Sequence, residues 1–354
     1  MTKARDLANL GNKTSLDEIN DAYDAGALSN RNVIINGAMQ VAQRGTSFTS
    51  NGYTMDRFRV ANGSVGNITT TQESTNSPSG VSKYSMKVTA TNTASLASSS
   101  DGWIRYVIET KDIENLTLSD TTKHFTVSFY VKCSDTGQSS IGVTSGNFSS
   151  AQYVSPFTIA NADTWQRVSV AIPCSSLLSN VNGDYGLRLY WDIGAGTNYQ
   201  TSSTNQWVTG GTYASSGNLQ ITGVNGRYLQ ITGVQLEVGD TATPFEHRSY
   251  GDELARCQRY YQLNTAMSGQ TYTSTQLSVH TSLATEMRSS PSISLFNGTS
   301  AAVDIGNAIR NITAISGTDL NNKLGNCLNL AISGTSNNKY HTVRGGVISM
   351  DAEL

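Results

Sequence analysis

Short runs of alternating apolar and polar residues follow one another from about residue 32 to residue 248, separated by clusters of Gly, Asn and Ser. Successive side chains of a β-strand point to opposite faces of a sheet, so each run predicts a strand with one buried face. No helical pattern lies between the runs. Strands at this spacing are typical of a β-sandwich. The clearest runs are residues 84–88, 103–108, 125–131, 166–172 and 187–191.

The composition supports this fold class and excludes several others. The chain has 354 residues, which allows two domains or one large β domain. Only 14% of the residues are charged, which excludes a coiled coil along the whole length and a charge-driven disordered protein. The net charge is -2 and the pI about 6.1, so a nucleic-acid partner is not expected.

The cysteines and the apolar segments predict an intracellular site of synthesis. Cys133, Cys174, Cys257 and Cys327 are far apart and form no C-x-x-C pair, which argues against a zinc site or a dense disulfide framework. The first residues contain no apolar stretch of the signal-peptide kind, and no window is apolar enough for a membrane helix. We expect synthesis in a reducing cytoplasm and no membrane insertion.

The first 29 residues differ in character from the rest and predict a separate N-terminal attachment segment. Ser15 and Glu18 have the spacing of a capping box at a helix start. Leu16, Ile19 and Tyr23 then form one apolar stripe. A helix of about three turns is marginal alone, so it needs a covering surface. Two interpretations stay open: a contact with other chains, or a helix lying on its own domain.

A second helical stretch follows the predicted sandwich. Residues 251–261 begin with acids, as a helix dipole prefers, and Leu254, Cys257 and Tyr261 share a face. We therefore expect a sandwich over 30–248, a connecting helix over 249–262 and a C-terminal β module over 263–354. Closed symmetry is the usual way for identical chains to cover such short stripes, which predicts a homotrimer. The predicted attachment or oligomer contacts are Leu16, Ile19, Tyr23, Leu254 and Tyr261.

One internal repeat is present. The hexapeptide LQITGV occurs at 219–224 and again at 229–234, with Asn225-Gly226 between the copies. Two alternating segments around an Asn-Gly turn predict a β-hairpin.

Motifs for catalysis are absent. A nucleophile elbow, a phosphate loop and an H-E-x-x-H pattern do not occur. Acidic residues are few in the middle of the chain, so a pair of carboxylates for glycoside hydrolysis is not indicated and we expect no enzyme. Asp56, Asp192 and Asp240 are the nominees for loop calcium, but no EF-hand spacing supports them and no cofactor is assigned.

Aromatic residues carry the strongest binding signal. The chain has 16 Tyr against 8 Phe and 4 Trp, and the Tyr ring with its hydroxyl suits wet, partly exposed surfaces. Aromatic residues surround the polar loop 194–200, which gives the stacking rings and amides of a sugar site. The alternative is that these rings fill the sandwich, and of the neighbours 190 and 191 only one can face the core. The predicted carbohydrate-binding residues are Tyr185, Tyr190, Trp191, Tyr199 and Trp207.

Four segments carry a resemblance to a known family. They are NVIING (32–37) with QRGTSF (43–48) and YTMDRF (53–58); IE (108–109) leading to FTVSFYVK (125–132); TWQR (164–167); and ITGVQLEVG (231–239) with PFEHRSYGDEL (244–254) and CQRYY (257–261). The chain resembles structural proteins of tailed bacteriophages, of the tail-fibre or receptor-binding type, with a jelly-roll domain like that of carbohydrate-binding modules.

The resemblance implies a virion component, made in the host cytoplasm and commonly trimeric, with no universal catalytic residues. It implies a mainly β chain with a jelly-roll sandwich, contacts to other virion proteins through the N-terminal segment, and attachment to a host-surface glycan. A head fibre, decoration or adaptor protein that binds nothing is the first alternative. A glycan-degrading tailspike is the second, although the chain shows none of the longer repeats expected of an extended depolymerase surface.

Overall fold

The computed structural model describes residues 31–354 except 64–65, 117, 147, 149, 179–183, 265–266, 274, 297–301, 306–307, 322–324, 333–339 and 345–347. The chain forms two compact units that meet in the sequence between Arg248 and Ser249. The predicted N-terminal helix with Leu16, Ile19 and Tyr23 lies outside the described residues.

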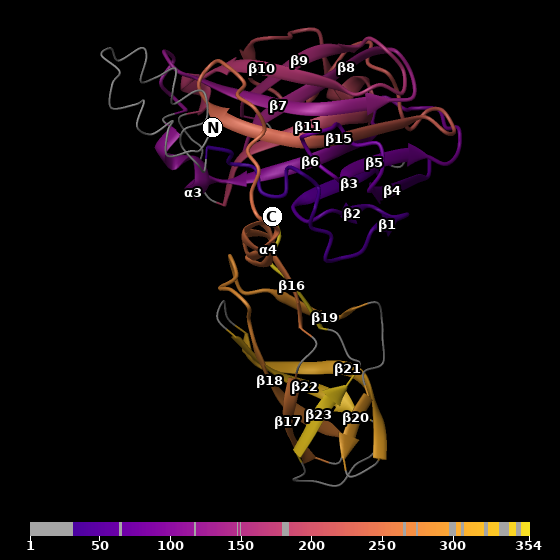
Figure 1. Cartoon of the computed structure of the whole chain (residues 1–354), viewed down its shortest axis with the longest axis vertical. Coiled ribbons are helices and arrows are strands. Elements are labelled where there is room, and N and C mark those ends of the chain that lie inside the picture. Colours follow the sequence, from indigo (N-terminus) through magenta and orange to yellow (C-terminus); the bar gives the residue numbers. More distant parts are fainter. Residues whose placement is uncertain are drawn as a thin grey trace. The chain divides into compact units, whose positions relative to one another are not determined.

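The first unit is a sandwich of two antiparallel sheets (Figure 1). The six-stranded sheet has the order β1 (Ser47–Phe48), β4 (Ile68–Glu73), β5 (Ser85–Ala90), β15 (Tyr228–Val238), β7 (His124–Cys133) and β10 (Gln166–Pro173). The seven-stranded sheet has the order β13 (Trp207–Val208), β9 (Gln152–Ile159), β8 (Gly137–Ser145), β11 (Tyr185–Ala195), β6 (Asp101–Glu109), β3 (Phe58–Gly63) and β2 (Gly52–Tyr53).

Short elements complete this unit. A parallel pair joins β12 (Gln200–Thr201) to β14 (Ala214–Ser215). The helical turns are α3 (Thr110–Ile113), η2 (Glu114–Leu116), η3 (Ser176–Leu178) and η4 (Thr197–Tyr199).

The core lies between the two sheets because both contribute their apolar faces to one cluster. Members from the six-stranded sheet include Val127, Phe129 and Ile231, and those from the seven-stranded sheet include Ile104 and Leu189. The predicted alternation thus has a direct cause: every second side chain of these strands enters the shared core. The prediction of a mainly β chain with a jelly-roll sandwich is confirmed.

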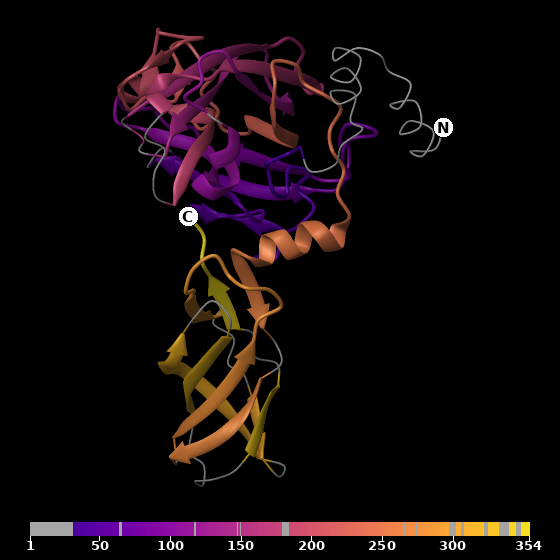
Figure 2. The same cartoon turned by 90° about the vertical axis from the view of Figure 1, so that its left-hand side faces the viewer.

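The second unit begins with the predicted connecting helix, α4 (Tyr250–Gln258), shown in Figure 2. The Ser249 hydroxyl accepts the amide N–H of Asp252 at 3.2 Å, which caps the helix start. The helix ends before Tyr261, so Tyr261 does not share a helical face with Leu254 and Cys257, and that part of the prediction is wrong. Tyr261 begins β16 (Tyr261–Asn264) and pairs with Asp351 of β24 (Ile348–Asp351).

The predicted C-terminal β module follows. β16, β24 and β19 (Ser292–Leu295) form a three-stranded sheet. Six further strands close on one another in the order β17 (Met267–Thr273), β18 (Gln276–Ser282), β22 (Gly325–Ile332), β21 (Ala308–Asn321), β20 (Ala302–Ile305) and β23 (Tyr340–Arg344). A separate apolar cluster that includes Leu277, Val279, Leu330 and Met350 fills this unit. Among the described helices of the chain, none is long and apolar enough to cross a membrane.

Candidate functional site

The outer face of the seven-stranded sheet concentrates aromatic and cationic side chains at its centre, on the neighbouring strands β3, β6 and β11. The alternation of side chains along each strand determines which residues reach this face. Ile104 and Leu189 point into the core, so the residues on either side of them in the sequence point outward. The outward positions are Arg59 and Ala61 on β3, Trp103, Arg105 and Val107 on β6, and Arg188, Tyr190 and Asp192 on β11.

A chain segment, residues 196–216, crosses part of this outer face and builds a second apolar cluster there. The rings of Tyr190 and Tyr213 stack at 5.0 Å, and Trp103 meets Tyr190 edge-on at 5.9 Å. Gly142 pairs with Tyr190 across the sheet, and a Cβ at Gly142 would lie 2.2 Å from the carbonyl oxygen of Tyr213. The missing side chain of Gly142 therefore lets the crossing segment approach.

Buried polar groups hold the crossing segment in place. The Tyr213 hydroxyl donates to Asp101 at 2.9 Å, and burial together with that carboxylate raises the pKa of Tyr213 above its ordinary range. Asp192 accepts the amide N–H groups of Gly194 and Ala195 at 2.9 and 2.8 Å and the Asn218 side-chain amide at 2.8 Å. Burial raises the pKa of Asp192 although these hydrogen bonds act in the opposite direction.

Two of the predicted carbohydrate-binding residues are enclosed. Trp191 is 0% exposed in the main core, where its ring meets Phe129 at 5.5 Å. Tyr190 is 3% exposed beneath the crossing segment. As the alternation requires, only Trp191 faces the core between the sheets, while Tyr190 points to the outer face and is covered there by the crossing segment. Neither ring is available to stack on a sugar, so the prediction is wrong for both.

The other three predicted rings lie in different places. Trp207 is half-buried at the edge of the sheet; its ring packs on Tyr153, and its indole N–H donates to the Pro173 carbonyl at 2.6 Å. Tyr199 is half-buried against Tyr213, at 5.7 Å. Tyr185, at the start of β11, is 39% exposed. The five rings therefore do not form one constellation, and Tyr185 is the most accessible.

Of the predicted anchoring or oligomer contacts, two lie among the described residues. Leu254 is half-buried on α4. Tyr261 is 4% exposed because it packs within the second unit, which leaves its ring unavailable to another chain.

Three arginines of this face were not among the residues predicted from the sequence. Arg59 and Arg105 are direct partners across β3 and β6, and Arg188 lies on the next strand, β11. The guanidinium carbon of Arg105 is 4.7 Å from the centroid of the Trp103 ring, and that of Arg188 is 4.9 Å from the Tyr185 ring. Each arginine is flanked in the sequence by two core residues, which marks it as outward. Their proximity depends on strand order, which the sequence pattern does not reveal.

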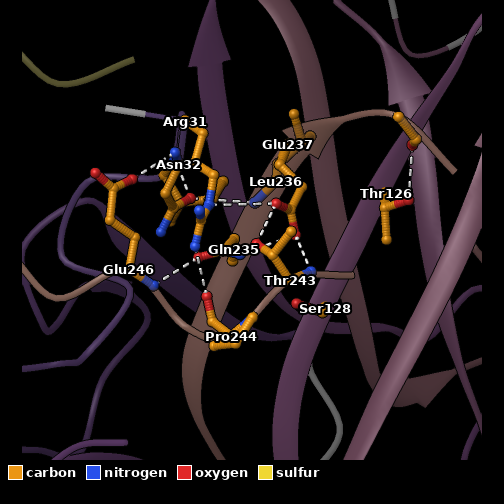
Figure 3. A network of polar contacts seen from close by, with 12 residues as sticks. Arg31, Asn32, Thr126, Ser128, Gln235, Leu236, Glu237, Thr243, Pro244 and Glu246 are labelled. Atoms are coloured by element: carbon orange, nitrogen blue, oxygen red, sulfur yellow. Dashed lines mark hydrogen bonds and ion pairs between the residues drawn. The ribbon is translucent and has the colours of Figure 1, made fainter. Parts of the chain in front are cut away.

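The segments that carry the family resemblance meet at a polar network on another part of the sandwich (Figure 3). Glu237 is buried at the end of β15 and accepts the amide N–H and the hydroxyl of Thr243 at 2.9 and 2.6 Å. Arg31 lies 3.6 Å from the Glu237 carboxylate and donates to the Pro244 carbonyl at 3.0 Å. This network joins the end of β15 to the segment that follows it.

The same network holds the first described residues against the last ones of the sandwich. The amide N–H of Asn32 donates to Glu246 at 2.7 Å, and the Asn32 side-chain oxygen accepts from Leu236 at 3.1 Å. Arg248 donates to the carbonyls of Ile34, at 2.9 Å, and Asn32. We call this set of contacts the terminal clamp. Within the resembling segments, Asn32, Glu246 and Arg248 thus hold the first and last residues of the sandwich together.

The carboxylates nominated for calcium have protein partners. Asp56 is buried and accepts from the Gln43 amide at 2.8 Å and from Arg44 at 3.1 Å. Asp240 is exposed and accepts from Thr241 at 3.1 Å. In the described part of the chain, no three His, Cys, Asp or Glu side chains come together as a metal site.

Several solved structures are similar to part of this chain at low identity and low TM-score. No family model and no curated protein matches the chain. The enzymatically active domain of tailspike protein 4 of bacteriophage CBA120 aligns with 59% of this chain and 21% of its own length, at 11% identity and a TM-score of 0.32. The chain thus spans about a fifth of that protein.

Two carbohydrate-binding modules align over nearly their whole length. The xylan-binding module CBM22-1 of Paenibacillus barcinonensis Xyn10C matches 55% of this chain and 94% of its own, at 13% identity and a TM-score of 0.27. The family 11 module of Clostridium thermocellum Lic26A-Cel5E matches 57% and 98%, at 12% and 0.27. Likenesses of this degree say nothing about a ligand or an activity.

Proposed function

We propose that this protein is a virion structural protein of the tail-fibre or receptor-binding type, which attaches a phage to a glycan on the host surface. The observation that carries the proposal is the outer face of β3, β6 and β11, where an accessible Tyr185 ring and three arginine side chains stand on a rigid sandwich. Aromatic rings and hydrogen-bond donors held by a rigid scaffold are what a sugar site requires. The four resembling segments support a place in the virion.

Binding without hydrolysis fits the carboxylates of this face. Asp101 is engaged by the Tyr213 hydroxyl, Asp192 is buried with three donors around it, and Glu109 is buried at 4% exposure. Glycoside hydrolysis needs two carboxyl groups that flank an accessible bond. We therefore propose a binding protein and not a tailspike enzyme.

The terminal clamp favours one second candidate. The clamp residues of the resembling segments hold the ends of the sandwich together and leave no role in binding assigned to them. The chain would therefore also suit a head fibre, decoration or adaptor protein in which the sandwich binds nothing. The two functions differ in one measurable property, which is affinity for cell-surface glycan.

The test is a binding assay with the full-length protein. Purified protein is applied to arrayed bacterial surface polysaccharides and to intact bacteria, and it is then used to compete with phage adsorption. Binding to a surface polysaccharide together with blocked adsorption supports attachment. Absence of both across the bacteria that the phage infects would leave the structural candidate.

The proposal includes assembly as a homotrimer anchored to other virion proteins through residues 1–29. Weak sites gain from threefold presentation through effective concentration. Native mass spectrometry of the full chain reports the assembly state. Deletion of residues 1–29 should abolish incorporation into particles while the sandwich still unfolds at the same temperature.

A further inference from the structure

We infer that Arg59, Arg105 and Arg188 form a subsite for the carboxylate groups of an acidic polysaccharide, an inference that rests on the proposed attachment function. The glycan would contain uronic or similar acidic sugars. It would place their carboxylates on the outer face of β3, β6 and β11 and a sugar ring near Tyr185.

The first argument is the placement of like charges. Arg59 and Arg105 are direct partners on neighbouring antiparallel strands. Arg188 is diagonal to Arg105, since Arg105 pairs with Tyr190 two residues further along β11. Like charges directly opposite each other destabilise a sheet, so this arrangement costs folding free energy unless an anion neutralises it.

The second argument is that the protein itself supplies no anion. Within the described residues, none of the three guanidinium groups forms an ion pair or a hydrogen bond, and the Nε atoms of Arg105 and Arg188 are buried without an acceptor. The carboxylates on the same face are Asp101, Glu109 and Asp192, and none pairs with these arginines. Each guanidinium has five N–H donors to offer.

The third argument is that the arginines are held in place without using those donors. Arg105 and Arg59 both lie over the Trp103 ring, at 4.7 and 5.8 Å, and Arg188 lies over Tyr185 at 4.9 Å. Cation–π contacts fix a guanidinium through its face and leave its edge for bidentate bonds to a carboxylate.

The choice of ligand follows from the neighbouring surface. Tyr185 is accessible beside Arg188, and a pyranose ring can stack there while its carboxylate reaches the arginine. A nucleic acid is a poor match, because its phosphate backbone requires an extended basic surface, whereas three clustered arginines suit a few carboxylates. A phosphodiester polymer and a general polyanion effect are the other outcomes that the experiment distinguishes.

The experiment uses the full-length protein and whole surface polysaccharide extracted from bacteria to which the protein adsorbs. One portion is left unmodified. A second is carboxyl-reduced, which converts uronic acids into neutral sugars, and a third is treated with hydrofluoric acid, which removes phosphodiesters. Binding of each immobilised portion is measured by interferometry, with single-stranded DNA as a competitor.

The variants are R59Q, R105Q and R188Q, with R105K to keep the charge but lose the planar fork. The matched control is K132Q. Lys132 lies on the six-stranded sheet with its ammonium 5.1 Å from the Trp165 ring, so K132Q also removes one ring-stacked positive charge.

We expect carboxyl reduction to abolish binding and hydrofluoric acid to leave it intact. R105Q and R188Q should each weaken binding about tenfold, the scale of one lost charged hydrogen bond. R59Q and R105Q should keep or raise the melting temperature, because each removes a like-charge contact; a variant that merely damaged the fold would lower it. R105K should weaken binding while K132Q should not.

Several results would overturn the inference. They are undiminished binding of the carboxyl-reduced glycan, wild-type affinity in the triple arginine variant, loss of binding after hydrofluoric acid alone, equal loss in K132Q, or full competition by DNA. If the wild-type protein fails to bind the unmodified extract, the attachment function itself is wrong. That result is distinct from a glycan that binds but does not need its carboxylates.

Discussion

Tyr190 and Tyr213 stack with their ring planes 23° from parallel, although the two residues belong to a central strand and to a segment that crosses outside it. This contact covers Tyr190 on the outer face of β11 and leaves Tyr185, at the start of the same strand, accessible. It depends on the lack of a side chain at Gly142, directly below the crossing segment.

Replacing Gly142 with alanine is therefore expected to destabilise the sandwich. The new methyl group would meet the Tyr213 carbonyl, and overpacking of this kind costs about 1–3 kcal/mol. Urea unfolding measures the loss, and near-ultraviolet circular dichroism reports the displaced rings. The control is G211A on the crossing segment, where a Cβ meets only the Phe148 ring, at 3.2 Å. Equal effects of both variants would contradict this account.

Truncation of Trp191 should lower the stability of the sandwich, whereas truncation of Tyr185 should affect binding. W191A removes a ring from the centre of the core and should cost about 3–5 kcal/mol of unfolding free energy. Y185A removes an accessible ring and should change stability by less than about 0.5 kcal/mol. Under the proposed function, Y185A should instead reduce adsorption to cells. Thermal unfolding and cell binding of the same samples separate the two effects. A stable W191A variant would contradict the packing described here.

Glu237 should be a strong determinant of stability because its buried carboxylate contacts Arg31, Gln235 and Thr243. E237Q keeps the shape of the side chain but weakens hydrogen bonds to a charged acceptor, and we expect a loss of about 1.5–3 kcal/mol. The nearby exposed residue provides the comparison: D240N should change stability by less than about 0.5 kcal/mol. Denaturant titration of both variants checks this, and the prediction fails if they behave alike.

Asp192 should impose a pH dependence of defined sign. Burial raises its pKa in the folded protein above the ordinary value of 3.8, so the folded state holds the proton more tightly than the unfolded chain. Between the two pKa values the folded state binds more protons, and the unfolding free energy therefore falls as pH rises through that window.

The D192N variant lacks this titration. The stability of the wild-type protein relative to D192N should therefore decline as pH is raised above 3.8, with the other carboxylates cancelling in the difference. Denaturant unfolding of both proteins at several pH values measures it. A difference that is constant with pH would show that Asp192 keeps an ordinary pKa.

Much of the fold could be predicted from the sequence because alternation is a local property. The runs around Ile104, Phe129 and Leu189 became strands whose apolar residues entered one core. The helix after the sandwich was also predicted, since the acids of its first turn are a local start signal. Its end was misplaced because Tyr261 pairs with Asp351, a contact far along the chain.

The repeated hexapeptide shows the limit of local reasoning. The predicted hairpin does not form: the second copy lies in β15, between β5 and β7, whereas the first copy is not a strand. In the first copy Ile221 enters the core, and the Thr222 amide donates to the Ile193 carbonyl at 2.8 Å. Identical residues thus adopt different structures according to what surrounds them.

The candidate site was harder to predict because it combines three strands that are distant in the sequence. Tyr185 was predicted from the clustering of rings and stays a prediction, whereas Arg59, Arg105 and Arg188 come together through strand order and register. The burial of Tyr190 could not be predicted from the local sequence either, since it requires a segment that follows β11 to return over the sheet.

The terminal clamp determines how the sandwich carries mechanical load. A pull on the chain at Arg31 and Arg248 would be resisted by the short bonds from Asn32 to Glu246 and from Arg248 to Ile34. Most of the two sheets lies outside that path, because the chain enters and leaves the sandwich at the same place and the clamp reaches the strands at the end of β15. Tension along the polypeptide would therefore act on a few polar contacts before it acts on most of the strands. A sandwich mounted in this way can stay folded, with its outer face intact, while the chain on either side of it is under strain.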